Sequence, residues 1–411
     1  MTAIGTFYVD CGDGTLAGTG VSGNTITRND TTDAPYTCTY TTGGVKTIKF
    51  AGLATRYIAI SSSDADAVET AAIRFGYFNN MNPYDSTPAL VAGIDGSLAT
   101  MFPSLGTARN ANPQFSGTFR GTKITSIPSG LFRGLTGGVH QFTRAFRECP
   151  NLTSIPGDLF SGITRCYDYQ FYGTFWGCTN LTSIPENLFG DLNNCAAPSL
   201  FQYAFYNCKG ITSIPGNLFR GIRGGATALF AQTFQECTNL QSIPDRLFSG
   251  VNTPARYLFH YTFYGCKNLS GYIPASAFVG LIDAGSPYNS ENGGMFADAF
   301  YNTKLLTTTC PRRTELVETG YEQYWGGRIA CAVPPPKIVT TSYVQGFYEE
   351  IDTKKQDKLE SGVNLITTGA PDGMVVSITA DHGVVHVHKE EIQIPVGSVE
   401  NPTGWLPIWV E

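Results

Sequence analysis

One unit of sequence recurs along residues 115–300, and this periodicity constrains the fold more than any other feature. Each copy approximates the pattern F-x-x-x-F-x-x-C-x-N-L-T-S-I-P-x-x-L-F-x-G, followed by a variable stretch. A fixed period of about 20–50 residues is typical of proteins that stack one small unit many times. A single copy buries too little apolar surface to fold alone, so neighbouring copies must cover each other. The isoleucines before the recurring prolines lie 28 to 30 residues apart, at Ile127, Ile155, Ile184, Ile214, Ile243 and Ile273.

The C-x-N-L-T-S-I-P segment of the unit resembles the leucine-rich repeats of bacterial surface proteins. The resemblance covers residues 90–300 and implies a solenoid, with a short strand at 152–155 on one face and a helical turn on the other. It also implies a habit of binding, but no particular chemistry. The paired phenylalanines, four residues apart, fit a helical turn because such a spacing points both rings into the core. The nearly invariant Thr-Ser pair predicts a row of structural hydroxyl groups.

Residues 1–55 have the composition of a small β-domain. We predict strands at 7–10, 36–40 and 45–50, with Gly-rich turns at 12–15 and 42–44. The V-D-x-G-D-G-T and Y-T-T-x-G-x-x-T-I segments resemble the polycystic-kidney-disease (PKD) type of β-sandwich, although Cys11 stands where that family often has Trp or Phe. Asp10 and Asp13 do not have the spacing of a calcium loop, so we expect them to stabilise the turn.

The other boundaries follow from where the repeat pattern weakens. Residues 56–114 connect the β-domain to the repeats and include a degenerate capping repeat at 94–102. The repeats occupy 115–308, a cap and Pro-rich spacer 309–336, and a helix-and-β oligomerisation or attachment segment 337–411. The predicted fold class is therefore α+β: a leucine-rich-repeat solenoid between a small N-terminal β-sandwich and a C-terminal helix plus β segment.

The C-terminal segment carries a short apolar stripe with helical spacing, at Val344, Phe347 and Ile351. A helix this short does not stand alone and is expected to pack against copies of itself. The K-Q-D-K-L and S-G-V-N-L strings within 343–365 are similar to segments of bacteriophage fibre proteins. That similarity implies a homotrimer formed through residues 340–411.

The final residues, 372–411, are rich in β-forming side chains, and strands are predicted at 375–378 and 384–388. His386 and His388 would point to one face of the second strand. In some phage tail fibres, H-x-H pairs from three chains surround a metal ion, so the fibre resemblance implies a metal site at His386 and His388. A solvated strand face is the alternative interpretation.

The chain has 11 cysteines, and neither a C-x-x-C pair nor another zinc signature occurs. Cys11 could face Cys38 across two strands, and Cys310 and Cys331 could close a loop. The odd total and the lack of a secretory signal after Met1, taken as the natural start, favour free thiols instead. Five cysteines recur once per repeat and predict a ladder of buried, reduced side chains: Cys149, Cys178, Cys208, Cys237 and Cys266.

Variable positions beside the phenylalanine pairs are rich in aromatic residues, whereas the frame of Leu, Ile, Pro and Phe is constant. Tyr and Trp supply rigid contact area at low entropic cost, as in many binding surfaces. The alternative is that these rings merely pack between adjacent turns. The candidate ligand-binding residues are Tyr169, Tyr172, Trp176, Tyr203, Tyr206, Tyr257, His260, Tyr261 and Tyr264.

Net charge and the lack of known motifs argue against several classes of function. Twenty-seven basic and thirty-three acidic residues give a net charge of −6, which argues against nucleic acid as the main partner. No apolar run is long enough for a membrane helix. No P-loop, zinc-protease or dinucleotide motif occurs, so neither an enzyme nor a cofactor is predicted, although the carboxylate pair of a glycosidase would not be visible in sequence.

The sequence therefore predicts a non-enzymatic bacteriophage fibre or decoration protein on the virion surface. Its repeats would bind a host surface protein or glycan, or an environmental surface, and its C-terminal segment would form the trimer and contact other virion proteins. The alternative is a bacterial cell-surface leucine-rich-repeat adhesin.

Overall fold

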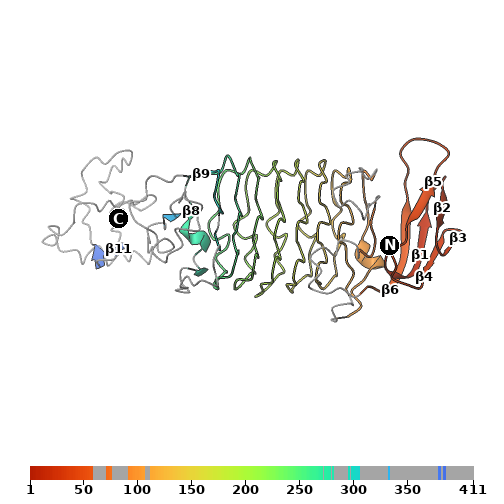
Figure 1. The fold of residues 1–411 in the computed structure, drawn as a ribbon, viewed down its shortest axis with the longest axis horizontal. Coiled ribbons are helices and arrows are strands. Elements are labelled where there is room, and N and C mark those ends of the chain that lie inside the picture. The colour runs from red at the N-terminus through yellow and green to blue at the C-terminus, as the bar shows by residue number, and fades with distance from the viewer. Residues whose placement is uncertain are drawn as a thin grey trace, which may run out of the picture. The chain divides into compact units, whose positions relative to one another are not determined.

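The computed structural model describes most of the chain up to Leu305 and only short pieces beyond it (Figure 1). Two compact units are distinguished, Met1–Thr309 with Arg313–Ala332, and Cys310–Arg312 with Val333–Glu411. The described residues are 1–58, 71–75, 91–106, 112–271, 273–278, 280–281, 295–296 and 298–305, together with the strands β10 (Ala332–Val333), β11 (Ile378–Ala380) and β12 (Gly383–Val385).

The N-terminal residues form two antiparallel sheets. A four-stranded sheet has the order β3-β4-β1-β6, and a two-stranded sheet pairs β2 with β5. Phe7, Val9 and Ile26 alternate with exposed residues along β1 and β4 and are buried, as expected for strands with one covered face. The strands are β1 (Ile4–Asp10), β2 (Thr15–Gly18), β3 (Val21–Ser22), β4 (Thr25–Arg28), β5 (Tyr36–Thr39) and β6 (Lys49–Arg56).

The predicted strands at 7–10 and 36–40 overlap β1 and β5, but the strand predicted at 45–50 is misplaced. β6 begins at Lys49, which pairs with Asp10, the last residue of β1, so residues 45–48 have no strand to pair with. That loop is held instead by Lys46, whose Nζ lies 2.6 Å from the Asp13 carboxylate. Asp10 accepts a hydrogen bond from the Gly12 backbone N–H, so the expectation that both aspartates stabilise the turn is confirmed.

A disulfide between Cys11 and Cys38 ties the end of β1 to β5, with the two Cα atoms 5.6 Å apart. The expectation that free thiols are favoured here is wrong, because β2 and β5 pair in a register that brings Cys38 beside the turn after β1. Cys310 and Cys331 lie outside the described residues.

The β-domain packs directly on the first coil of the repeats. The Phe7 ring lies 5.5 Å from Phe102, and the Tyr57 hydroxyl donates to the Pro103 carbonyl. Phe102 ends a short turn that includes α1 (Leu98–Met101), and its ring contacts Phe115 of the first repeat. The segment predicted as a capping repeat, 94–102, thus lies at the end of the stack and covers apolar surface of the first repeat.

The repeats follow one another as successive coils, seen side by side in Figure 1. We number them by their phenylalanine pairs, 115/119, 142/146, 171/175, 201/205, 230/234, 259/263 and 296/300. Around each pair the backbone makes four-residue turns, in which N–H groups alternate between two acceptors. In the third repeat, Phe171 N–H donates to the Leu200 carbonyl of the next coil, and Tyr172 N–H donates to Tyr169 three residues back. In the third repeat every backbone N–H from Phe171 to Cys178 is used in this way.

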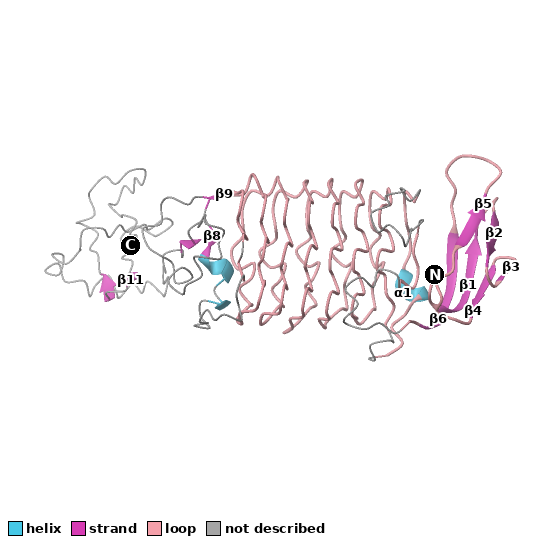
Figure 2. Cartoon of the chain, viewed as in Figure 1, coloured by secondary structure: helices cyan, strands magenta, loops and turns pink. Residues whose placement is uncertain are grey.

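Neither the helical turn nor the strand implied by the leucine-rich-repeat resemblance is observed in this form. Figure 2 shows the coils as loop, and residues 152–155 are not assigned to a strand. A helix is excluded at the phenylalanine pairs because a residue with positive φ, such as Gly173 or Gly177, recurs at every fourth position and interrupts helical geometry. Strand pairing at the Thr-Ser segment is limited to single bonds, such as Thr153 N–H to the Thr125 carbonyl. Membership of the leucine-rich repeats stays a prediction.

Three rows of phenylalanine run through the inside of the array. The first ring of each pair stacks on its counterpart in the next coil with centroids 4.9–6.2 Å apart, and the second with centroids 5.3–5.7 Å apart. The phenylalanine of the Leu-Phe motif forms the third row, with centroids 5.5–6.3 Å apart. We call these rows the phenylalanine ladders. They make the core continuous from one coil to the next.

The ladder cysteines are buried and free, as predicted, in all five repeats that carry them. Each thiol also donates a hydrogen bond across the coils, for example from Cys208 Sγ to the Phe175 carbonyl at 3.0 Å. Thr174 and Thr233 have the same role one turn earlier, since their hydroxyls donate to Phe142 and Phe201. A small side chain with one donor therefore suits this inward position.

A second disulfide, Cys166–Cys195, joins the third and fourth coils and was not predicted. Its two residues are 29 apart, which is one repeat period, so stacking brings them to equivalent places. The backbone of Cys195 also forms an isolated parallel β-bridge with Ile222 of the following coil. This disulfide links the two coils that hold the variable stretches before Phe171 and Phe201.

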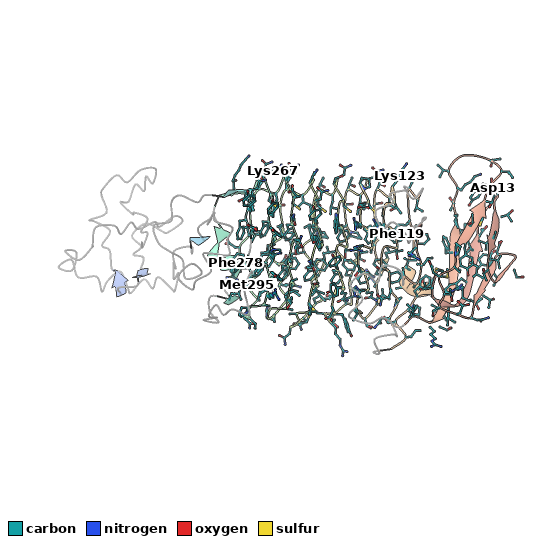
Figure 3. All side chains as sticks on the ribbon, in the orientation of Figure 1. Asp13, Phe119, Lys123, Lys267, Phe278 and Met295 are labelled. Carbon is teal, nitrogen blue, oxygen red and sulfur yellow. A yellow bond between two sulfur atoms is a disulfide. The ribbon has the colours of Figure 1, made fainter. Side chains whose placement is uncertain are left out.

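The Thr-Ser pairs form exposed rows between buried Leu and Ile side chains. The hydroxyls of Thr153 and Thr182 donate to the threonine carbonyl of the preceding coil, at 3.2 and 3.3 Å, so the predicted hydroxyl row is confirmed for these threonines. In Figure 3, Lys123 and Lys267, which come just before this segment in their repeats, lie along the same long edge of the array.

The array ends in short elements: β7 (Ser270–Gly271) pairs in parallel with β9 (Lys304–Leu305), and β8 (Ile273–Pro274) precedes the 3-10 turn η1 (Ala275–Phe278). In the second unit, β11 and β12 form an antiparallel pair that overlaps the strands predicted at 375–378 and 384–388. The apolar helical stripe predicted at Val344, Phe347 and Ile351, the prolines 334–336 of the spacer, and His386 and His388 lie outside the described residues.

Burial raises the pKa of the thiols of Cys178, Cys208 and Cys266 well above the usual value, and that of Cys237 to about 12. Since the thiolate is the reactive species, we expect a maleimide to modify none of these four side chains in the native protein at pH 8. After unfolding in guanidinium, all four should react, as peptide mass spectrometry would show. Rapid labelling of native Cys208 would mean that the coils open locally or are not stacked as described.

Candidate binding face

Each four-residue turn of the repeats sends two side chains inward and two outward. In the turn that begins at Phe171, Phe171 and Thr174 are fully buried, whereas Tyr172 is half-buried on the outer side. The residue after Tyr172, Gly173, has a positive φ of 57°. The equivalent positions line up from repeat to repeat as columns, in which the larger side chains reach the surface and the short ones, Ser116, Thr143 and Ala231, are buried.

All nine candidate residues lie on this face and are half-buried. They fall into two groups because the fifth repeat has small or flexible side chains at the same positions: Ala228, Ala231, Gln232 and Gln235. The first aromatic cluster, on the third and fourth repeats, comprises Tyr169, Tyr172, Trp176, Tyr203 and Tyr206. The second aromatic cluster, on the sixth and seventh repeats, comprises Tyr257, His260, Tyr261, Tyr264 and also Tyr301, which sequence reasoning did not include.

The first aromatic cluster is held by ring contacts between the two repeats. Trp176 stacks on Tyr203 with centroids 4.9 Å apart and contacts Tyr206 at 4.8 Å. Tyr203 also meets Tyr172 edge-on at 5.4 Å. These contacts are of the offset and edge-to-face kinds that aromatic rings prefer. Part of each ring is therefore used in packing between coils, while the outer part remains accessible.

Two arginines of the second repeat border the first aromatic cluster. The Arg147 guanidinium lies 4.0 Å from the Trp176 ring centre, and that of Arg144 lies 5.3 Å from Tyr172. Arg147 also forms a salt bridge with Glu148 at 2.9 Å. Cations over aromatic faces are attracted by the ring quadrupole, so the arginines and rings form one contiguous surface.

The second aromatic cluster has a different charge. His260 lies 4.0 Å from Tyr261 and 5.1 Å from Tyr257, and Tyr264 stacks on Tyr301 at 5.3 Å. Burial lowers the pKa of His260, only partly opposed by Asp298, so the imidazole is neutral at pH 7. Asp298 adds a carboxylate to this cluster, and Arg256, whose guanidinium lies 4.7 Å from the Tyr257 ring centre, adds a cation, so the cluster carries both charges.

Burial raises the pKa of the phenols of Tyr172, Tyr203, Tyr206 and Tyr261 above the usual value. Nearby carboxylates add to this rise, Glu236 for Tyr206 and Asp298 for Tyr261. The four hydroxyls therefore stay protonated at neutral and mildly alkaline pH, and each remains able to donate a hydrogen bond.

Four of the tyrosines occupy a backbone conformation that disfavours them. Bulky residues rarely adopt positive φ, whereas Gly and Asn do so at little cost. At the position of Tyr203 and Tyr261, other repeats hold Gly117, Gly173, Arg144 or Gln232, so the turn does not need a tyrosine. Backbone geometry therefore does not account for the rings, which pack between coils with one part and stay accessible with another. The tyrosines with positive φ are Tyr169, Tyr203, Tyr257 and Tyr261.

Other sites have less support. Among the residues that the structure describes there is no cluster of three or more His, Cys, Asp or Glu side chains suited to a metal ion. The metal site predicted at His386 and His388 lies outside them. No helix in the described ranges is both long and apolar enough to cross a membrane.

Sequence reasoning located the aromatic columns but missed Tyr301, Arg144 and Arg147. Tyr301 follows the second phenylalanine of the seventh repeat, as Trp176, Tyr206 and Tyr264 do in theirs, so extending the column would have found it. The arginines carry no such signal, because only the stacking of coils brings the second repeat beside the aromatic residues of the third.

The stability of Tyr203 variants tests the conformational argument. Tyr203→Asn and Tyr203→Ala lose much the same ring contacts, but Asn tolerates positive φ far better than Ala. We expect the asparagine variant to be more stable by about 0.5–1 kcal/mol, a fraction of the cost of the left-handed conformation. Chemical unfolding of both variants measures this difference. Equal stabilities would imply that residue 203 does not hold the left-handed conformation.

Comparison of the chain with protein-family models, with curated proteins and with solved structures finds no match. What this face does is therefore argued from its own geometry and chemistry.

Proposed function

We propose that the protein is a non-enzymatic binding protein of a bacteriophage virion, a fibre or decoration protein, whose aromatic face attaches to a host or environmental surface. The observation that carries the proposal is the pair of aromatic clusters on the outward columns of a rigid array. Four tyrosines there are held at positive φ, a cost that the third repeat avoids with Gly173 at the position of Tyr203 and Tyr261.

The architecture of the coils supports binding in preference to catalysis. Ladders of stacked phenylalanine and backbone hydrogen bonds fix the frame, while the outward residues differ from repeat to repeat. Repeat proteins use such extended, variable surfaces for recognition. Tyrosine and tryptophan provide large contacts with few rotatable bonds, which lowers the entropic cost of binding.

The virion location rests on the C-terminal resemblance to fibre proteins, which implies a homotrimer formed through 340–411 and contacts with other virion proteins. The ligand would be a host surface protein or glycan. The alternative is a bacterial cell-surface adhesin, and the two disulfides are compatible with it because such bonds persist in oxidising surroundings such as a cell surface. A virion surface is also oxidising, so the oligomeric state separates the two proposals better.

Attachment of Tyr203→Asn and Tyr261→Asn tests the binding face. Each change removes an outward ring at a position where the backbone accepts Asn, and we expect attachment to weaken by about 1–2 kcal/mol if the ring is central. The control is Ser183→Ala, which removes an exposed hydroxyl from the Thr-Ser rows and should bind normally. Attachment to host cells and thermal unfolding are measured together. Unchanged attachment by both tyrosine variants would exclude the aromatic face.

The oligomeric state tests the virion proposal. The full chain should scatter light as a trimer, and a chain ending at Pro336 should be a monomer, because the apolar stripe that would hold the copies together follows the spacer. Unfolding of the array, followed by loss of its near-ultraviolet signal, should be similar in both chains. A monomeric full chain would count against the fibre proposal and in favour of the adhesin.

A further inference from the structure

The first aromatic cluster has an excess of positive charge, although the chain as a whole has a net charge of −6. Arg147 and Arg120 share the Glu148 carboxylate, which lies 2.9 Å and 3.5 Å from their guanidinium groups. Arg144 has no carboxylate within salt-bridge distance among the residues that the structure describes. Its Nε atom is buried and has no hydrogen-bond partner there. The side chain as a whole is half-buried, and a buried donor of this kind is costly unless a ligand completes its bonding.

The surroundings of Arg144 leave it pointing into the binding face. Its guanidinium lies over the Tyr172 ring, and its charge also lowers the pKa of the Tyr203 phenol, against the larger effect of burial. A planar guanidinium beside aromatic rings favours an anion of planar, bidentate geometry, which a carboxylate has. Arg144, the phenols of Tyr172 and Tyr203, and the Arg147–Glu148 pair beside Trp176 therefore form a site in which Arg144 is the cation without a carboxylate partner among the described residues.

The kind of molecule that can carry this anion is limited by the backbone. The N–H groups of the face are consumed within turns and between coils, as at Tyr172, Gly173 and Tyr203, so an extended peptide cannot add to the array as a strand. The neighbouring outward groups are phenols and amides, for example Gln202, whose Nε2 lies 3.3 Å from Gln232 Oε1. Such groups suit the many hydroxyls of a sugar chain, and aromatic edges suit its C–H groups.

The coils also present these groups at a regular spacing. Backbone hydrogen bonds join each coil to the next, which sets them about 4.8 Å apart. A polymer of similar units that lies along the array can therefore place successive units over successive coils, with one unit at Arg144 and its neighbours at the aromatic side chains of the next two repeats. A polysaccharide has this regularity, whereas a folded acidic protein does not.

We propose that the first aromatic cluster binds an acidic glycan, with a sugar carboxylate on Arg144 and the sugar rings against Tyr172, Trp176 and Tyr203. This rests on the proposed function of the same face and specifies its ligand class. The second aromatic cluster, which contains Asp298, is not part of this proposed glycan-binding site.

The array itself supplies the test variant. Residue 232 is the counterpart of Arg144 in the fifth repeat, and it is a glutamine with φ of 58°, against 54° for Arg144. Arg144→Gln should therefore fold normally while it removes the cation. Lys209→Gln is the matched control, since it makes the same change of charge at an exposed position in the Cys-Lys-Gly turn, outside the face.

The experiment uses the full chain and titrates it with alginate oligosaccharides, with dextran oligosaccharides of the same length, and with polyglutamate. We expect alginate to bind, dextran to bind at least tenfold more weakly, and salt to weaken the alginate complex. Arg144→Gln should weaken alginate binding about tenfold or more, the effect of losing one charged hydrogen bond, whereas Lys209→Gln should not.

Equal binding of alginate by Arg144→Gln and the unchanged protein would overturn the proposal, as would binding of dextran equal to that of alginate. Polyglutamate that binds as tightly as alginate would assign the site to acidic peptides instead and also overturn it. These failures differ from failure of the proposed function, because Tyr203→Asn would still weaken attachment to host cells. If neither arginine nor tyrosine variants change any binding, both proposals fail.

Discussion

The stacking of phenylalanine on phenylalanine, coil after coil, is the interaction on which the rest of this structure depends. The rings of the first two phenylalanine ladders are nearly parallel, with interplanar angles of 3–14°. Such close registry is possible only if each coil has the same path as the last. The four-residue turn provides that path, because it returns a phenylalanine to the interior at a constant interval.

That path also separates the frame from the face. The inward positions of the turns that begin at these phenylalanines hold Phe, Thr, Ala or Cys, and donors there, such as Thr174 and Cys208, reach the carbonyl of the preceding coil. Outward positions meet no such demand, and they hold residues as different as Arg144, Gly173, Tyr203 and Gln232 in one column. Function can therefore vary on this protein without disturbing its core. The arginines beside Trp176 illustrate how one repeat completes the surface of its neighbour.

Sequence alone was sufficient for whatever the repeat period controls. The buried ladder of Cys149 to Cys266 and the outward placement of Tyr203 follow from counting along the unit. The conformation of the turns did not follow, because phenylalanines four apart fit a helix as well as a run of turns. The distinguishing signal was the glycine two residues after each of Phe115, Phe119, Phe171 and Phe175, where φ is positive.

The remaining discrepancies are long-range. The Cys166–Cys195 disulfide spans one repeat period, yet two cysteines in a variable stretch give no hint that they align. The start of β6 was misplaced because it depends on where its partner β1 ends, which local composition does not show. Arg144 and Arg147 were missed for the same reason, since their aromatic partners are nearly a full repeat away in the chain.

The direction of the hydrogen bonds has a mechanical consequence. They run from each coil to the next, along the stack. A force that pulls the two ends of the array apart would therefore break the bonds of one coil at a time and detach the coils in order. Each freed coil of about 29 residues would lengthen the chain by roughly 100 Å. The Cys166–Cys195 disulfide closes one such loop covalently, so the length between its two cysteines cannot be released. The coils that carry the first aromatic cluster would thus keep a covalent tie while their neighbours yield.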